Sequence, residues 1–165
     1  MTDEFEPTLD DYINRLKFKE DDEIHQNAFW VLGRYRDEPR IIEPLIQALN
    51  DENAGVRTRA AEVLGNIKDE RIFMPLMQAL NDADSDVRVQ AARSLGMIGD
   101  VRAAEALLNV LNDPLPEVRS QAAESLSLLK QPETGVALVA ALLNDDDDNV
   151  RYFAGKALIA IKGED

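Results

Sequence analysis

The side chains best suited to chemistry in this sequence are carboxylates, which cluster at two points of the chain. Asp82, Asp84 and Asp86 alternate as the first ligands of a calcium-binding loop do. The sixth position of such a loop is Val87 instead of the glycine that its turn needs, and the twelfth is Arg93 instead of a bidentate glutamate. The spacing of these aspartates therefore argues against a calcium site.

A second acidic run, residues 145–148, consists of four aspartates. Such a run attracts cations weakly, but a solvated turn followed by a helix N-cap explains it better. Nucleophilic catalysis has equally little support, because the chain contains no cysteine, a single histidine (His25) and no glycine-rich phosphate loop. We therefore expect no catalytic residue, no metal site and no cofactor.

Composition restricts the possible partners. The 165-residue chain has 32 acidic and 18 basic side chains and a formal net charge of -14. Nucleic acids and anionic membranes are bound largely through lysine and arginine, so both are disfavoured. The segment Met-Thr-Asp-Glu-Phe-Glu-Pro at the start is acidic without an apolar signal region, and no stretch approaches the length of a membrane span. These features predict a cytoplasmic protein.

A repeated dipeptide indicates how the elements that carry these residues are organised. Val-Arg occurs four times, at intervals of 31, 31 and 32 residues. The four copies begin at Val56, Val87, Val118 and Val150. A fixed period of this length is typical of a solenoid, in which one structural unit is copied and stacked.

Each copy contains two predicted helices joined by a turn. The first, helix A, carries Pro-Leu-x-x-Ala-Leu, a pattern that stands at 44–49 and 75–80 and decays at 106–111 and 138–143. The second, helix B, carries Val-Arg-x-x-Ala-Ala-x-x-Leu-Gly-x-Ile, best preserved at 56–67 and 87–98. Its apolar positions share one helical face. We call this repeated pattern the frame and the arginine of its Val-Arg dipeptide the frame arginine. An Asn-Asp turn precedes each frame arginine by six residues. Pro44 and Pro75, about six residues after the expected N-caps Asp37 and Asp69, predict a kinked or irregular first turn of helix A.

A fainter copy precedes these four, with His25 at the position of the frame arginine. We expect His25 to form a capping or inter-repeat hydrogen bond and to have no catalytic role. The predicted organisation is an acidic tail over 1–6, a single repeat domain over 7–162 and a short tail over 163–165. Within the domain, helix pairs are expected at about 7–36, 37–68, 69–99, 100–130 and 131–162.

The combined frame of the two helices resembles the short HEAT repeat, and more narrowly the HEAT-like repeats of phycobilisome (bilin) lyases. The resemblance covers nearly the whole chain and is closest at 51–80 and 82–111. It implies an all-α fold, a right-handed α-solenoid (superhelix) of about five HEAT-like helix pairs. The A helices would lie on its convex side and the B helices on its concave side. Function does not follow from the fold alone.

The resemblance also implies a structural role for the repeated charges, because the Asp and Arg of successive turns in such repeats form a buried or half-buried ladder. The corresponding residues share one spacing and are Asp51 and Arg57, Asp82 and Arg88, Asp113 and Arg119, and Asp145 and Arg151. Each arginine stays in register while its neighbours vary. We therefore expect the frame arginines to hold the repeats together instead of binding a ligand.

The variable positions of helix B are better candidates for binding a partner. Positions one, two and five after each frame residue should face the concave groove, with the ninth beside them. The expected partner-binding residues are Gln26, Asn27, Trp30, Arg34, Arg59, Glu62, Gln90, Arg93, Met97, Gln121, Glu124, Tyr152 and Lys156. Arginine, methionine and aromatic side chains are typical of binding hot spots. An alternative interpretation is that Trp30, Tyr152 and Phe153 are caps that close the ends of the core. The two interpretations are equally good for Phe153, whereas the groove is favoured for Trp30 because Phe29 already takes the inward alanine position.

These observations favour a non-catalytic scaffold that binds another protein or a peptide through its concave face. The alternative, which follows from the resemblance, is a bilin lyase subunit or a related factor that binds a bilin chromophore or a phycobiliprotein, with groove arginines pairing to bilin propionates. Two other HEAT-repeat classes are disfavoured: di-iron hydroxylases need His-Glu pairs, and HEAT-like DNA glycosylases need a basic groove. Irregular loops and degenerate outer repeats favour a natural over a designed repeat protein.

Overall fold

The computed structural model describes residues 7–16 and 22–163, with side chains described from residue 27 in the second range. Every regular element in these ranges is a helix. The first helices of the pairs are α1 (Leu9–Arg15), α3 (Ile42–Ala48), α5 (Phe73–Ala79), α7 (Ala104–Val110) and α9 (Gly135–Asn144). The second helices are α2 (Asp22–Arg34), α4 (Ala54–Leu64), α6 (Ser85–Ile98), α8 (Pro116–Leu129) and α10 (Asp148–Lys162).

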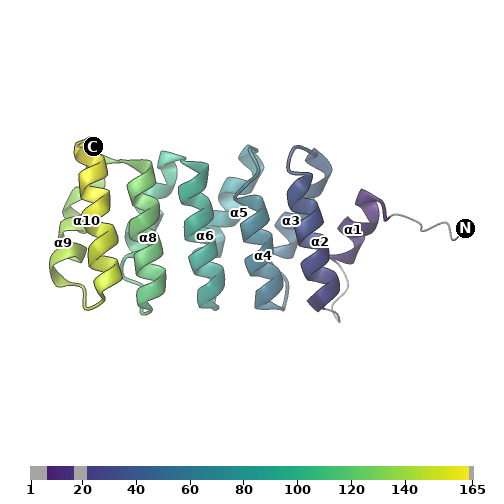
Figure 1. The fold of residues 1–165 in the computed structure, drawn as a ribbon, viewed down its shortest axis with the longest axis horizontal. Helices are drawn as coiled ribbons and strands as arrows, with labels where there is room; N and C mark the ends of the chain where they lie inside the picture. Colours follow the sequence, from purple (N-terminus) through teal and green to yellow (C-terminus); the bar gives the residue numbers. More distant parts are fainter. Residues whose placement is uncertain (1–6, 17–21, 164–165) are drawn as a thin grey trace, which may run out of the picture.

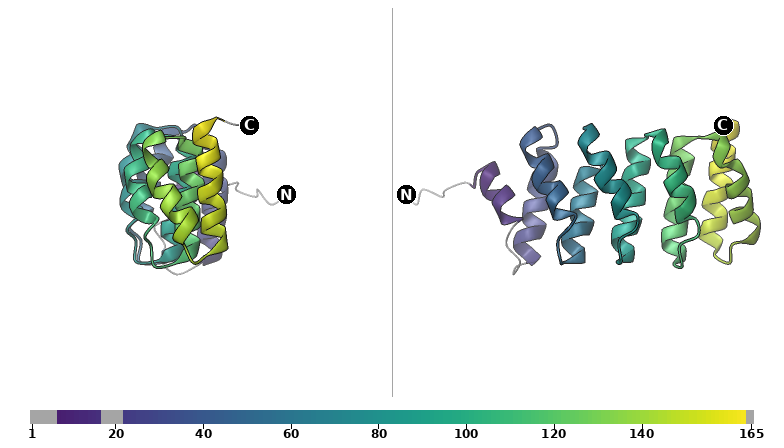
Figure 2. Two further views of the ribbon diagram at one scale, coloured as in Figure 1. Left: turned by 90° about the vertical axis from the view of Figure 1, so that its left-hand side faces the viewer. Right: turned by 180° about the vertical axis from the view of Figure 1, so that it is seen from behind.

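The pairs stack side by side in chain order, so the molecule is an elongated array of two layers (Figure 1). The second helices form one layer, and the first helices lie behind them, as the views from the end and from behind confirm (Figure 2). Each second helix packs against the one before it along the array. The predicted all-α solenoid is therefore confirmed. The tails expected at 1–6 and 164–165 lie outside the described residues.

Helices α3, α5, α7 and α9 each begin with a short 3-10 turn. These turns are η1 (Pro39–Ile41), η2 (Glu70–Ile72), η3 (Val101–Ala103) and η4 (Pro132–Thr134). Asp69 caps η2, as expected, whereas η1 is capped by Glu38 instead of Asp37. Pro44 and Pro75 consequently stand at the third residue of their α-helices, directly after the irregular 3-10 turn, where a proline needs no N–H bond within the α-helix.

Leucines from the first helices fill the space between the two layers. Leu45, Leu76, Leu107 and Leu138 are fully buried, and the alanine pairs of α4, α6 and α8 are fully buried in the same core. Leu138 therefore occupies the register of Leu107, one residue away from the register expected from the pattern at 138–143. The Val-Arg dipeptide of this repeat comes 32 residues after the previous one, so the repeat has one additional residue. The starts of η3 and η4 are still 31 residues apart, and α9 is longer than α7 and ends at Asn144, so the additional residue lies toward the end of helix A and not before it. As a result Leu143, the last residue of the pattern at 138–143, lies 71% exposed.

Neighbouring second helices approach closely where a glycine of one meets a serine of the next. Ser94 is buried and donates its hydroxyl to the Ala61 carbonyl oxygen at 2.8 Å, and Ser125 repeats this contact with Ala92 at 2.8 Å. A Cβ atom placed on Gly96 would lie 2.7 Å from the Ser125 Oγ, and one on Gly65 would lie 2.6 Å from the Ser94 Cβ. Gly65 and Gly96 are thus required by the close approach of neighbouring second helices.

Candidate functional site

The repeated charges of the turns form ion pairs between successive helix pairs. The Arg57 Nε and Nη2 atoms each donate to the Asp82 carboxylate at 2.8 Å. Its Nη1 donates to the main-chain carbonyl oxygen of Asp51, in its own turn, at 2.8 Å. The arginine therefore uses its planar fork to bridge the two turns, a geometry that lysine could not reproduce.

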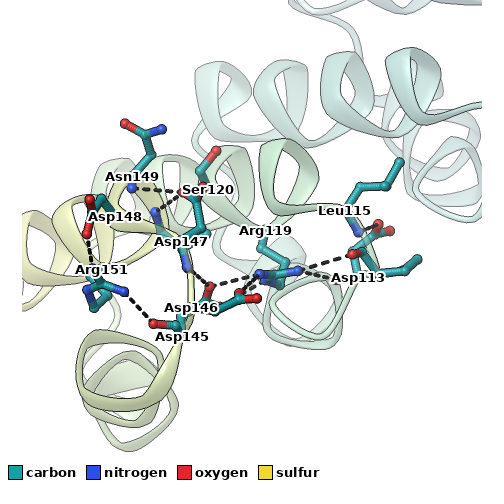
Figure 3. Close-up of polar contacts among 12 residues, drawn as sticks. Asp113, Leu115, Arg119, Ser120, Asp145, Asp146, Asp147, Asp148, Asn149 and Arg151 are labelled. Atoms are coloured by element: carbon teal, nitrogen blue, oxygen red, sulfur yellow. Dashed lines mark hydrogen bonds and ion pairs between the residues drawn. The ribbon is translucent and has the colours of Figure 1, made fainter.

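The same arrangement recurs along the array. Arg88 binds the Asp113 carboxylate at 2.8 and 3.0 Å, and Arg119 binds Asp145 with two contacts of 2.8 Å. Figure 3 shows Arg119 between Asp113, whose carbonyl oxygen it contacts at 3.0 Å, and the Asp145 carboxylate. These side chains are largely shielded from solvent. We call this set of bridges the Asp–Arg ladder.

Opposing effects set the pKa of the ladder carboxyls. Burial by itself raises the pKa of Asp82 and of Asp113, but hydrogen bonds from the partner guanidinium and from a main-chain N–H outweigh it, so each pKa lies below its ordinary value. At Asp145 the hydrogen bonds from Arg119 are the largest influence, and they also lower the pKa. All three carboxylates are therefore ionised at neutral pH.

The ladder differs at its two ends. Arg151 contacts the Asp145 carbonyl oxygen at 2.6 Å and pairs with Asp148 of its own helix. Its side chain is 36% exposed, against 12% for Arg88. At the other end, the Asp51 carboxylate accepts the Asn53 N–H at 2.8 Å, while the side chain of His25 lies outside the described residues.

The residues predicted to bind a partner lie on the second helices. We call their outer surface the B-helix face: the exposed side of α2, α4, α6, α8 and α10. Nine of the predicted residues are exposed there, namely Asn27, Trp30, Arg34, Arg59, Glu62, Arg93, Met97, Tyr152 and Lys156. Gln90, Gln121 and Glu124 are half-buried, and Gln26 falls outside the described side chains.

Trp30 borders a hollow of about 450 Å³ between α2 and α4. The hollow is lined by Phe29, Trp30, Gly33, Arg59, Glu62, Val63 and Asn66. Trp30 is 66% exposed whereas Phe29 is buried, so the indole lies outside the core. The Arg34 guanidinium stacks over the indole at 5.1 Å from its centre. Gly33 and Val63 were not predicted for this site, although the missing side chain of a frame glycine was a signal that space opens there.

A second aromatic group lies on α10. Tyr152 and Phe153 meet edge to face with ring centres 5.2 Å apart, and the Lys156 ammonium group lies 5.7 and 5.6 Å from the two rings. Phe153 is half-buried and packs against the core, which favours a capping role for it. Tyr152 is exposed. The two aromatic groups therefore mark opposite ends of the B-helix face.

Between these ends the face carries polar pairs together with exposed Met97 and Leu128. Arg59 and Glu62 form an ion pair at 2.7 Å on α4, and Gln121 donates to Glu124 at 3.0 Å on α8. Among the predicted residues whose side chains are described, cations outnumber carboxylates by four (Arg34, Arg59, Arg93, Lys156) to two (Glu62, Glu124). The rest of the acidic chain has the opposite balance, so the predicted positions differ from the remainder of the chain in charge.

The carboxylates of the turns and the lengths of the helices bear on metal binding and membrane insertion. Within the described ranges, histidine and carboxylate side chains do not gather into a group of three that could hold a metal ion. Asp84 and Asp147 instead cap α6 and α10 by accepting main-chain N–H groups. None of the helices that the structure describes is both long and apolar enough to cross a membrane.

The fold and the ladder define an α-solenoid built from tandem helix pairs. Comparison with known families gives the same class: the family model described as HEAT repeats matches residues 9–73 and 73–159. The chain therefore belongs to the HEAT-repeat family. No curated protein sequence matches it.

Several solved structures share this architecture. The complex of CpcE and CpcF of phycocyanin lyase from Nostoc sp. PCC7120 contains a chain with a TM-score of 0.82 and 26% identity, and the match covers 99% of this chain and 69% of that one. A designed armadillo repeat protein in complex with the peptide (KR)4 matches with a TM-score of 0.71 and 19% identity over 93% and 81% of the two chains. Human deoxyhypusine hydroxylase in complex with glycerol matches with a TM-score of 0.65 and 19% identity over 94% and 74%. The last two similarities concern the fold alone.

Proposed function

We propose that the protein is a non-catalytic scaffold that binds a protein or peptide segment along the B-helix face. The observation that carries this proposal is the arrangement of exposed side chains at equivalent positions of successive second helices. These side chains vary from one repeat to the next, whereas the buried residues of the same helices repeat. A partner lying across the array would meet Trp30, Arg59, Arg93 and Tyr152 in turn.

The composition of this face suits a protein partner. Trp30 offers a large, rigid apolar surface beside a hollow, and arginine and tyrosine are enriched among residues that dominate binding energy. Arg34 beside the indole and exposed Arg93 on α6 would favour a segment that carries carboxylates near its apolar anchor. The face lacks a nucleophile paired with a base among its described residues, which supports binding instead of catalysis.

The test is capture of partners from a native lysate by the immobilised full-length chain. We expect Trp30→Ala and the double variant Arg59→Ala/Arg93→Ala to lose a partner that the wild type retains, with unchanged circular dichroism because these side chains are exposed. Arg40→Ala is the matched control, since Arg40 is an exposed arginine of η1 in the other layer. Retention of every partner by both groove variants would refute the proposal.

A second candidate function is supported by one specific observation, the similarity to a chain of the phycocyanin lyase complex. In this hypothesis the chain handles a bilin chromophore or a phycobiliprotein, and Arg59 or Arg93 pairs with propionate groups while Trp30 stacks on a pyrrole ring. The measurement is titration of the purified chain with free bilin and with phycobiliprotein. Absence of both an absorbance shift and complex formation would exclude this candidate and leave the general scaffold proposal intact.

A further inference from the structure

The second helix of the second pair, α4, ends earlier than its neighbours in the array. It has 11 residues, whereas α2 has 13 and α6 has 14. Its last residue, Leu64, stands seven positions after Arg57, and the last residue of α6, Ile98, stands ten positions after Arg88. Ile67 has therefore left the helix at the position where α6 is still helical.

A second hollow, of about 490 Å³, lies beside this early end of α4. Its lining includes the apolar side chains of Phe73 and Met97 and the exposed Lys68. We call it the Met97 hollow, and the one described above the Trp30 hollow. Asn66 lines both, so the two adjoin. One opens on the α2 side of α4 and the other on the α6 side, since α4 lies between these helices (Figure 1).

The carboxylates that line the two hollows all form ion pairs with arginines. The pairs are Glu62 with Arg59 at 2.7 Å, Asp69 with Arg71 at 2.9 Å, Glu70 with Arg102 at 2.8 Å, and Asp100 with the same Arg102. Their charges are already matched from within the chain. The lining of the hollows therefore gives a basic ligand little to pair with.

The remaining cations around the hollows lack such a partner. Among the described residues, Arg34, Lys68 and Arg93 are exposed and form no ion pair with a carboxylate. Arg34 stacks over the indole of the Trp30 hollow, and Lys68 lines the Met97 hollow. Arg93 precedes Met97 by one helical turn on the same side of α6. In a chain with a net charge of -14, unmatched cations beside apolar hollows indicate an occupant that brings carboxylates.

The separation of the hollows limits the shape of the occupant. Packed helices lie about 8–10 Å apart, and the hollows lie on the two sides of one helix. A polyproline II segment has about three residues per turn and rises about 3.1 Å per residue, so side chains three positions apart point to the same side about 9 Å from each other. Two apolar side chains at this spacing in an extended segment would reach both hollows.

We propose that the two hollows bind an extended acidic segment of a partner protein through two apolar side chains three positions apart. The carboxylates of this segment pair with Arg34, Lys68 and Arg93. The inference rests on the proposed scaffold function, because the Trp30 hollow belongs to the B-helix face. It adds the Met97 hollow and Lys68 to the site, and it restricts the partner to a linear segment of stated charge.

Selection from a random library of linear peptides displayed on phage, with the full chain as bait, tests the proposal. We expect enriched peptides with a net negative charge and two apolar residues three positions apart. The tightest of them is then made synthetically and titrated by fluorescence anisotropy. Its dissociation constant should rise at least about 10-fold in Met97→Glu and in Lys68→Glu, because each change removes a contact and adds a like charge.

Two control variants carry the same changes away from the hollows. Met74→Glu alters an exposed methionine of α5 in the other layer. Lys162→Glu alters an exposed lysine at the end of α10, eleven residues after Arg151 as Lys68 is after Arg57. Both should raise the dissociation constant less than about 2-fold, as expected of charges outside the interface. An effect as large as that of the hollow variants would overturn the proposal, since overall charge would then explain it.

The selection itself is equally decisive. An absence of enriched peptides, enrichment of basic ones, or binding that Met97→Glu and Lys68→Glu leave intact overturns the proposal. The lysate capture described above separates this failure from that of the scaffold function. A partner that Trp30→Ala loses from the lysate, together with an empty peptide selection, would keep the scaffold and exclude only the linear segment.

Discussion

At the scale of single residues, the ladder arginines and the exposed arginines of the B-helix face lie in different surroundings despite their common chemistry. Arg88 satisfies a shielded carboxylate and two main-chain carbonyl oxygens of its own turn. Arg93, five positions further along the same helix, is exposed. The contrast follows from the helical periodicity, which turns one arginine toward the neighbouring turns and the other toward solvent.

We predict that Arg88→Ala lowers the free energy of unfolding by about 2–4 kcal/mol, because Asp113 would keep a shielded charge without its partner. Arg93→Ala should change it by less than about 0.5 kcal/mol, as expected of an exposed side chain. Urea denaturation of both variants is the measurement. Equal losses would disprove the structural role of the ladder.

The ladder also predicts how stability depends on pH. Because the folded-state pKa values of Asp82, Asp113 and Asp145 lie below their unfolded values, the folded protein binds fewer protons than the unfolded chain in acid. Their contribution is complete above the ordinary carboxyl pKa of about 4 and is lost as the pH falls through the folded values. Thermal melting between neutral and acidic pH should show a shallower acid dependence in Asp113→Asn than in the wild type. Identical slopes would contradict this assignment.

At the scale of elements, the spacing of the second helices depends on a notch in one helix filled by a serine of the next. Gly65 and Gly96 provide the notches, and Ser94 and Ser125 fill them. A Cβ atom placed on Gly33 would lie 3.9 Å from the Val63 Cγ2, an ordinary contact, so this glycine leaves room for a methyl group. Two glycines at the same position of the repeat should therefore tolerate a side chain very differently.

We predict that Gly65→Ala destabilises the fold by about 1–3 kcal/mol, since the new methyl group would force α4 and α6 apart. Gly33→Ala should be neutral or stabilising by up to about 1 kcal/mol, because alanine is the better helix former and meets no close neighbour. Thermal and urea unfolding compare the two variants. A Gly65→Ala protein as stable as Gly33→Ala would show that the notch does not fix the helix spacing.

At the scale of the whole molecule, stability is the sum of contacts between neighbouring helix pairs, as in other solenoids. Arg119 connects the fourth pair to the last one through Asp145 and Asp146. Arg151 contacts Asp145 and Asp148, both within its own pair. Loss of either arginine should therefore destabilise only the neighbouring helices. Loss of Arg119, unlike loss of Arg151, should also weaken the contact between the fourth and the last pair.

We predict that Arg119→Ala increases amide hydrogen exchange mainly in α9 and α10, while the protection of α4 is preserved. Arg151→Ala is the control and should have a much smaller effect, because its side chain is partly exposed and bridges no further pair. Exchange measured by mass spectrometry resolves these segments. A uniform loss of protection along the chain would indicate a cooperative unit instead of a nearest-neighbour array.

The sequence alone determined the repeat period, the helical class and the division of helix B into a constant inner side and a variable outer side. These features depend on contacts within one repeat or between neighbours, so a 31-residue period and helical spacing are enough to read them. The predicted binding residues whose side chains are described lie on the second helices for the same reason.

Only the tertiary structure decided how the repeats meet. The constant spacing of Asp and Arg left open which atoms pair, and the structure placed each carboxylate against the arginine of the preceding repeat. The structure also shows that the core positions of α9 lie one residue earlier than the sequence pattern indicated, so that Leu143 is exposed. It places Trp30 outside the core. These outcomes depend on distances between helices far apart in sequence, and periodicity along the chain contains no information about such distances.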